Sequence, residues 1–149
     1  MTIYPFKADG KATHLHPDGA TFTITQPEWG GHVRSNGNND NKGWVHVPVM
    51  IPPEVDGKRL KLQKVDVAYA TGWKTRLDAI QVAMGSDKIL YKDVGHSHDK
   101  VDTEEFAVPG TPRVDKTIEI SLLLTMNSGP DEHGRWATVE SVGTYLSPV

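Results

Sequence analysis

The chain has 149 residues, a net charge of −3 and no cysteine. This length predicts one domain over residues 1–149 that can bury a core without covalent staples. The lack of cysteine excludes disulfides, thiolate metal sites and a cysteine nucleophile. Neither half of the chain has a basic stripe with interleaved aromatic residues, which argues against nucleic acid as a partner.

The N-terminus, MTIYPFKADGK, lacks the apolar segment that a signal peptide needs, and no later segment has the length of a membrane span. We therefore expect a soluble protein without a membrane span, cytoplasmic by default, with export by a non-classical route as the alternative.

The first third of the chain predicts one short strand between polar segments. Residues 1–19 form a polar, turn-rich N-terminal segment. Phe22 and Ile24 alternate with threonines, which predicts a half-buried strand. Residues 27–43 are rich in Gly and Asn and predict a long loop, and loops of this length are usually functional or mobile.

Residues 43–71 carry the strongest β signal. Val45, Val47 and Val49 alternate with polar or bulky residues, and Pro48 predicts a strand that lies at an edge or is paired on one side. Asp56-Gly57 predicts a tight turn. The apolar phase then slips by one residue near Gln63-Lys64, which indicates a bulge or a bend from one sheet to the other.

The second half predicts further strands. Residues 80–84 and 89–91 form a hairpin closed by Gly85-Ser86-Asp87, and residues 118–126 form the most regular strand. Residues 93–105 form a polar loop. Residues 136–146 close the fold, with Val139 and Tyr145 expected on one face and Trp136 and Val142 on the other. Seven to nine short strands without a capped helical period predict an all-β, antiparallel two-sheet sandwich, jelly-roll-like or immunoglobulin-like.

Five short motifs carry a family resemblance: GWVHVP with IPP (43–53), DGKRL (56–60), AIQV (79–82), GHSH (95–98) and FAVPG (106–110). Over about residues 20–146 the chain resembles a group of small bacterial β-sandwich proteins classed as a domain of unknown function. The resemblance implies a β-sandwich. It implies no activity, substrate or catalytic residue.

The aromatic residues suggest a binding surface. Trp44 and His46 lie on the strand face opposite the valines, and Trp29 and Trp73 lie in expected loops. Exposed tryptophans can stack on sugar rings or form a protein interface, whereas in most sandwiches a tryptophan packs in or beside the core. The candidate ligand-binding residues are Trp29, Trp44, His46 and Trp73.

Two His-x-His motifs suggest a metal site. In an extended segment such pairs share a face, so His96 and His98 can bind one ion together with Asp99 and Asp102. His14, His16 and Asp18 form a weaker second set. The match to a cupin metal box is poor because no glutamate follows His98 at the expected three or four residues. Calcium is the alternative ion, held by carboxylates of the same loop (Asp99, Asp102, Glu104 and Glu105).

These observations predict a non-enzymatic module for recognition or self-assembly, with no catalytic residue and no required cofactor. The expected partner is a second copy, another protein or a glycan. Pro48, Lys61 and Lys64 on edge strands would keep such assembly specific. Two alternatives remain: a carbohydrate-binding module that uses exposed tryptophans, and a metal-dependent enzyme at the His-Ser-His-Asp segment.

Overall fold

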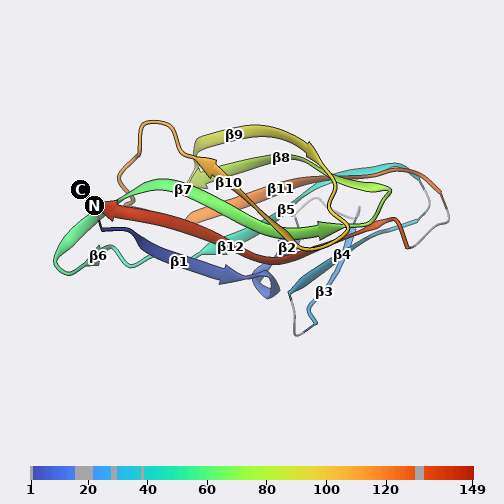
Figure 1. The fold of residues 1–149 in the computed structure, drawn as a ribbon, viewed down its shortest axis with the longest axis horizontal. Helices are drawn as coiled ribbons and strands as arrows, with labels where there is room; N and C mark the ends of the chain where they lie inside the picture. Colours follow the sequence, from blue (N-terminus) through green and yellow to red (C-terminus); the bar gives the residue numbers. More distant parts are fainter. Residues whose placement is uncertain (1, 16–21, 28–29, 38, 130–132) are drawn as a thin grey trace.

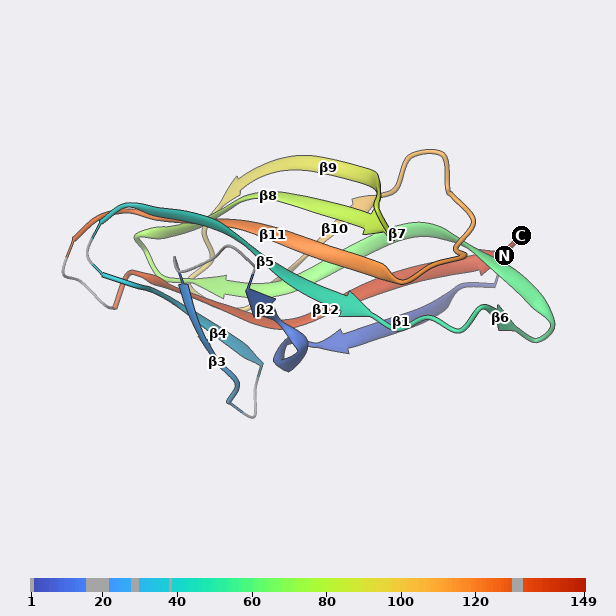
Figure 2. The ribbon, with the colours of Figure 1, turned by 180° about the vertical axis from the view of Figure 1, so that it is seen from behind.

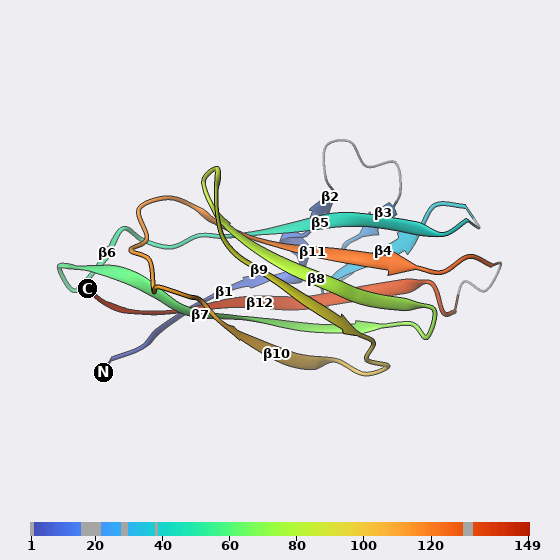
Figure 3. The same cartoon turned by 90° about the horizontal axis from the view of Figure 1, so that it is seen from above.

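The computed structural model of the chain describes residues 2–15, 22–27, 30–37, 39–129 and 133–149. In this part of the chain, twelve strands form two antiparallel sheets that pack as a sandwich. Figure 1 looks onto the sheet that contains β7 and β12, Figure 2 looks onto the sheet that contains β5 and β11, and Figure 3 shows the two layers from the side. The predicted all-β sandwich is confirmed, with more strands than the seven to nine expected.

The first sheet has the order β10-β7-β12-β4-β3, and β1 and β6 pair with β12 and β7. Its strands are β1 (Tyr4–Asp9), β3 (Phe22–Thr25), β4 (Gly31–Ser35), β6 (Glu54–Val55), β7 (Lys58–Thr71), β10 (Asp102–Ala107) and β12 (Trp136–Pro148).

The second sheet has the order β2-β5-β11-β8-β9. Its strands are β2 (His14–Leu15), β5 (Asn41–Val49), β8 (Thr75–Met84), β9 (Asp87–His96) and β11 (Ile118–Met126). A three-residue 3₁₀ helix, η1 (Gly10–Ala12), follows β1. No helix among the described residues has the length and apolar character to cross a bilayer.

Alternating apolar residues build the core between the sheets, as their period of two predicts. Val45, Val47 and Val49 of β5 are fully buried, and so are Ile118 and Ile120 of β11. Pro48 pairs with Glu119 of β11, while on the other side of β5 the described residues of β2 pair only with Val45 and His46. At Pro48 the strand is therefore paired on one side, as expected for a residue without an N–H.

The predicted turn and bulge near β7 are confirmed. Asp56 and Gly57 both have positive φ and join β6 to β7, which is the conformation that favours an Asp-Gly pair in a two-residue hairpin. Lys64 and Leu62 of β7 pair with the consecutive residues Tyr145 and Leu146 of β12, so Gln63 between them is the extra residue of a bulge. The strand continues beyond it in the same sheet and does not cross to the other one.

Three segments expected to be irregular contain strands. Residues 1–19 supply β1 and β2, residues 27–43 supply β4 and the start of β5, and residues 93–105 supply the end of β9 and most of β10. Their alternation is weak because the strands are short or lie at sheet edges, where polar residues are tolerated. Pairing with neighbours distant in sequence makes them strands.

The expected faces of the closing strand are wrong in part. The register of β12 with β7 shifts between Val139 and Ser141. This bulge puts Val142 in the core together with Val139, and leaves Trp136 and Tyr145 on the outer face. A strict period of two cannot reveal such a change of phase.

A further bulge, at Asp78 of β8, is held by a polar cluster. The residues on either side of Asp78, Leu77 and Ala79, pair with Leu124 and Leu123 of β11. The Asp78 carboxylate accepts hydrogen bonds from Thr125 Oγ1 and Arg76 Nε. Burial raises its pKa, but these hydrogen bonds and the charges of Arg76 and Lys42 outweigh burial, and the net pKa is lowered.

We predict that Asp78→Ala lowers the free energy of unfolding at neutral pH by about 1–3 kcal/mol, the usual effect of losing hydrogen bonds to a charged group. Because the folded-state pKa of Asp78 lies below its unfolded value, this stabilisation is present above the unfolded pKa and is lost as the pH falls through the folded pKa. Urea unfolding from about pH 6 to about pH 3 should therefore show the difference from wild type shrinking. The exposed Asp115→Ala serves as control, and a difference that is independent of pH would contradict the explanation.

Candidate functional site

An aromatic pair covers the outer face of the second sheet. Trp44 of β5, Leu123 of β11 and Ala79 of β8 are direct neighbours across the strands, and Tyr91 of β9 lies beside the same row. The rings of Trp44 and Tyr91 meet edge to face, with centroids 6.3 Å apart and planes at 65°. Ala79 is 1% exposed although it points outward, which shows that larger side chains cover it. We call these four residues the Trp44 face.

Polar side chains lie in the next row of the same face. His46, Ser121 and Gln81 are cross-strand neighbours, and Gln81 pairs with Tyr91. His46 Nδ1 lies 2.6 Å from Ser121 Oγ and 3.3 Å from a carboxylate oxygen of Glu119. Hydrogen-bonding groups therefore flank the aromatic pair.

The other predicted tryptophan sites lie elsewhere. Trp73 is 69% exposed, but it lies in the turn between β7 and β8, against Gly134, with Lys74 Nζ 5.0 Å from its ring centroid. Trp29 lies outside the described residues. Of the four predicted ligand-binding residues, Trp44 and His46 thus lie on one face. Tyr91, which is 54% exposed, lies on the same face, although the sequence predicted it only as part of a strand.

A hollow of about 330 Å³ lies on the outer face of the first sheet. Trp136 and Thr138 of β12, His32 of β4 and Ala70 of β7 line it together with residues 99–101. Trp136 stacks on His32 at 5.8 Å with an angle of 25° between the rings. Asp99, predicted as a metal ligand, lines this hollow.

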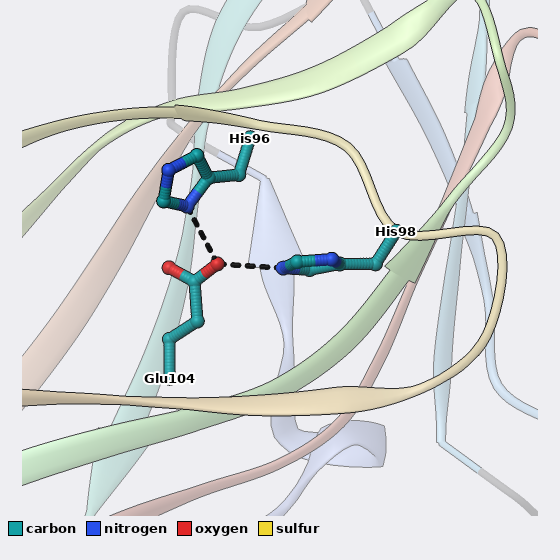
Figure 4. A group of neighbouring side chains, drawn as sticks. All are labelled: His96, His98 and Glu104. Carbon is teal, nitrogen blue, oxygen red and sulfur yellow. Dashed lines mark hydrogen bonds and ion pairs between the residues drawn. The ribbon is translucent and has the colours of Figure 1, made fainter.

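A cluster of three side chains lies where the edges of the two sheets come together. His96 ends β9 of the second sheet, Glu104 lies on β10 of the first, and His98 lies in the connection between these strands (Figures 3 and 4). His96 Nδ1 is 2.7 Å and His98 Nε2 is 2.6 Å from the same oxygen, Glu104 Oε1. We call these residues the His-His-Glu cluster; their ligand atoms all lie within 4.8 Å of one another.

Neighbouring groups hold the cluster in place. The backbone N–H of His98 donates to Thr71 Oγ1 at 3.0 Å, and the Thr71 N–H donates to the His98 carbonyl at 2.6 Å. Ser97 Oγ donates to the Thr75 carbonyl at 2.5 Å. The connection is thus fixed to the ends of β7 and β8.

Tyr69 of β7 supports the cluster from the interior. It is 2% exposed, donates its hydroxyl to Glu104 Oε1 at 2.9 Å, and its ring lies 5.1 Å from that of His98. Burial, the hydrogen bond to Glu104 and nearby carboxylates raise the Tyr69 pKa. Burial raises the Glu104 pKa, but hydrogen bonds from His98, His96 and Tyr69 outweigh it, so the net pKa is lowered. The carboxylate is therefore ionised at neutral pH.

Two of the four predicted metal residues meet in this cluster. His96 and His98 converge, whereas Asp99 lines the hollow described above and Asp102 Oδ1 accepts the hydrogen bond of the Thr103 N–H. The third member is Glu104, which the sequence suggested only as a calcium ligand. Among the described residues no other three side chains of this kind lie close enough together to hold a metal ion. The four residues predicted to bind calcium do not meet at one point, because Glu105 points to the outer face, where its Oε2 lies 3.1 Å from Lys64 Nζ. Had residues 102–107 been recognised as a strand, their alternation would have turned Glu104 and Glu105 to opposite faces and so distinguished the two glutamates.

The fold is that of a two-sheet sandwich also seen in carbohydrate-binding modules. The xylan-binding module CBM15 is similar with a TM-score of 0.61 at 12% identity, over 99% of both chains. TmCBM61, solved with β-1,4-galactotriose, gives 0.55 at 11% over 95% of this chain and 91% of that one. CBM29_1 from Piromyces equi gives 0.52 at 11% over 98% and 91%. At such identities these likenesses show a shared fold.

The chain itself belongs to a family of unknown function, DUF6623, whose family model matches residues 19–147. The resemblance seen in the sequence motifs is thereby confirmed. No curated protein matches the sequence.

We predict that Tyr69→Phe destabilises the fold by about 1–2 kcal/mol, because it removes a hydrogen bond to a charged carboxylate while keeping the buried ring. Chemical denaturation would measure this loss. Tyr91→Phe removes a hydroxyl from an exposed ring and should change stability by less than about 0.5 kcal/mol. If Tyr69→Phe were as stable as wild type, the hydrogen bond would contribute nothing to the fold.

Proposed function

We propose that this protein is a carbohydrate-binding module and that the Trp44 face binds the glycan. The observation that carries the proposal is the pairing of Trp44 with the exposed Tyr91 ring on a sheet face. Large exposed aromatic groups mark binding surfaces, because their burial against a ligand removes much apolar area from water.

The neighbouring polar row suits a sugar. A pyranose ring presents a face of C–H groups that packs on an aromatic ring, and its hydroxyls need hydrogen-bond partners at the rim. Gln81 pairs directly with Tyr91, and His46 lies in the same row, next to the row of Trp44; both provide such partners. The two inclined rings can contact a sugar from two sides.

The charges near the face favour a neutral glycan. Asp93 pairs with Ala79 at one side, and Glu119 lies beside His46 at another. The basic groups nearby, Arg76 and Lys42, are engaged with Asp78. Uronic acids would meet the carboxylates of Asp93 and Glu119 here, and like charges disfavour binding.

The structural neighbours support the same class, since their titles describe xylan binding and a β-1,4-galactotriose complex. Self-assembly, the first expectation from the sequence, has no comparable support, and a homo-oligomer remains a prediction. Glycan binding is therefore the function we favour.

We predict that Trp44→Ala and Tyr91→Ala each weaken glycan binding at least about tenfold, equivalent to about 1.4 kcal/mol. Affinity electrophoresis in gels containing xylan, β-1,4-galactan or a polysaccharide rich in uronic acid, followed by calorimetry on the best ligand, would measure this. Circular dichroism would verify that each variant is folded.

Trp73→Ala is the matched control, because it removes an equally large and more exposed ring outside the face. It should bind like wild type. Absence of retardation of the wild-type protein in all gels, or loss of binding with Trp73→Ala alone, would reject the Trp44 face as the glycan site.

A further inference from the structure

The geometry points to a metal site that is separate from the glycan face: we propose that His96, His98 and Glu104 bind one divalent transition-metal ion, with zinc as the expected ion. Two imidazole nitrogens, from His96 and His98, point at one carboxylate oxygen of Glu104 (Figure 4), and the three ligand atoms lie within 4.8 Å of one another. This inference does not rest on glycan binding.

Hydrogen bonding alone accounts poorly for the arrangement. Two histidine nitrogens and the Tyr69 hydroxyl lie 2.6–2.9 Å from the single oxygen Glu104 Oε1. A carboxylate oxygen has two lone pairs, so three donors exceed its capacity. An ion between the histidines and the carboxylate would replace two of these contacts with coordination bonds and leave the Tyr69 hydroxyl as the supporting donor to the ligating carboxylate.

The distances are close to those that an ion needs. Zinc bonds to nitrogen and oxygen are roughly 2.0–2.2 Å, so tetrahedral ligand atoms lie about 3.4 Å apart. The histidine nitrogens must therefore move away from Oε1 by roughly 0.7 Å. The His96 side chain is 58% exposed and can swing by this amount. At His98 the hydrogen bonds to Thr71 hold only the backbone, so its side chain, which is 24% exposed, can make the adjustment.

The donor set selects the class of ion. Imidazole nitrogens suit zinc, copper or nickel, whereas calcium and magnesium require mostly oxygen ligands.

The position of the cluster indicates what a bound ion would do. His96 belongs to the edge strand of one sheet and Glu104 to the edge strand of the other, so the ion would link the two edges. A hollow of about 580 Å³ adjoins the cluster and is lined also by Lys92, Ser97, Glu105 and Phe106. Three protein ligands leave a fourth position, which would open to this hollow for water or an oxygen ligand.

Zinc titration of tag-free protein by calorimetry tests the proposal, together with melting curves. We expect one ion per chain and a rise in Tm of roughly 8 °C at a zinc concentration about a hundred times Kd. Calcium should not raise Tm. Cobalt in place of zinc should give the visible absorption of a four-coordinate site.

Glu104→Gln and His98→Gln should each weaken zinc binding at least about tenfold, because even the loss of a group that only supports a metal ligand costs about that much. His14→Gln is the matched control, because His14 also lies beside a carboxylate, with its Nε2 3.9 Å from Glu119, yet outside the cluster. It should bind zinc like wild type. Lack of zinc binding by folded wild-type protein, or zinc binding that survives both cluster substitutions and fails in His14→Gln, would overturn the proposal.

Discussion

The register between β7 and β12 is the constraint on which the other features depend. These two long strands lie at the centre of the first sheet, and each carries a bulge against the other. Their register turns Tyr69 toward the interior, and β10 then aligns on β7 so that Glu104 shares that face. A slip by one residue would turn both side chains outward, because neighbouring residues of a strand face opposite sides. The position of the His-His-Glu cluster therefore depends on the backbone pairing of β7 with β12, which do not themselves carry its three residues.

Strand β9 contributes to both candidate sites. Tyr91 points outward to the Trp44 face, and His96 at the end of the strand points inward toward Glu104. The sheet itself thus separates the two regions. Aromatic stacking and ion coordination can operate without sharing a side chain, so a carbohydrate-binding function and a metal link between the sheets are compatible in one sandwich.

Several features could be predicted from local patterns. The valines of β5, the Asp56-Gly57 turn and the bulge near Gln63 all lie where the sequence placed them. Strand β4 and the acidic first part of β10, residues 102–105, could not be found, because glycine and acidic residues give no apolar alternation. The bulge in β12 also gave no signal, and so Val142 was assigned to the wrong face.

The sequence by itself determined the two-sheet sandwich and singled out Trp44, His46, His96 and His98 as side chains able to bind. Alternation and turn chemistry are local properties: alternation indicates on which side of a strand a residue lies, and turn residues indicate where a strand ends. Only the tertiary structure decided that Tyr91 joins Trp44 and that Glu104, in place of Asp99 or Asp102, meets the two histidines. These partners come from strands whose pairing is non-local, and the register of that pairing is fixed by burial of the whole core.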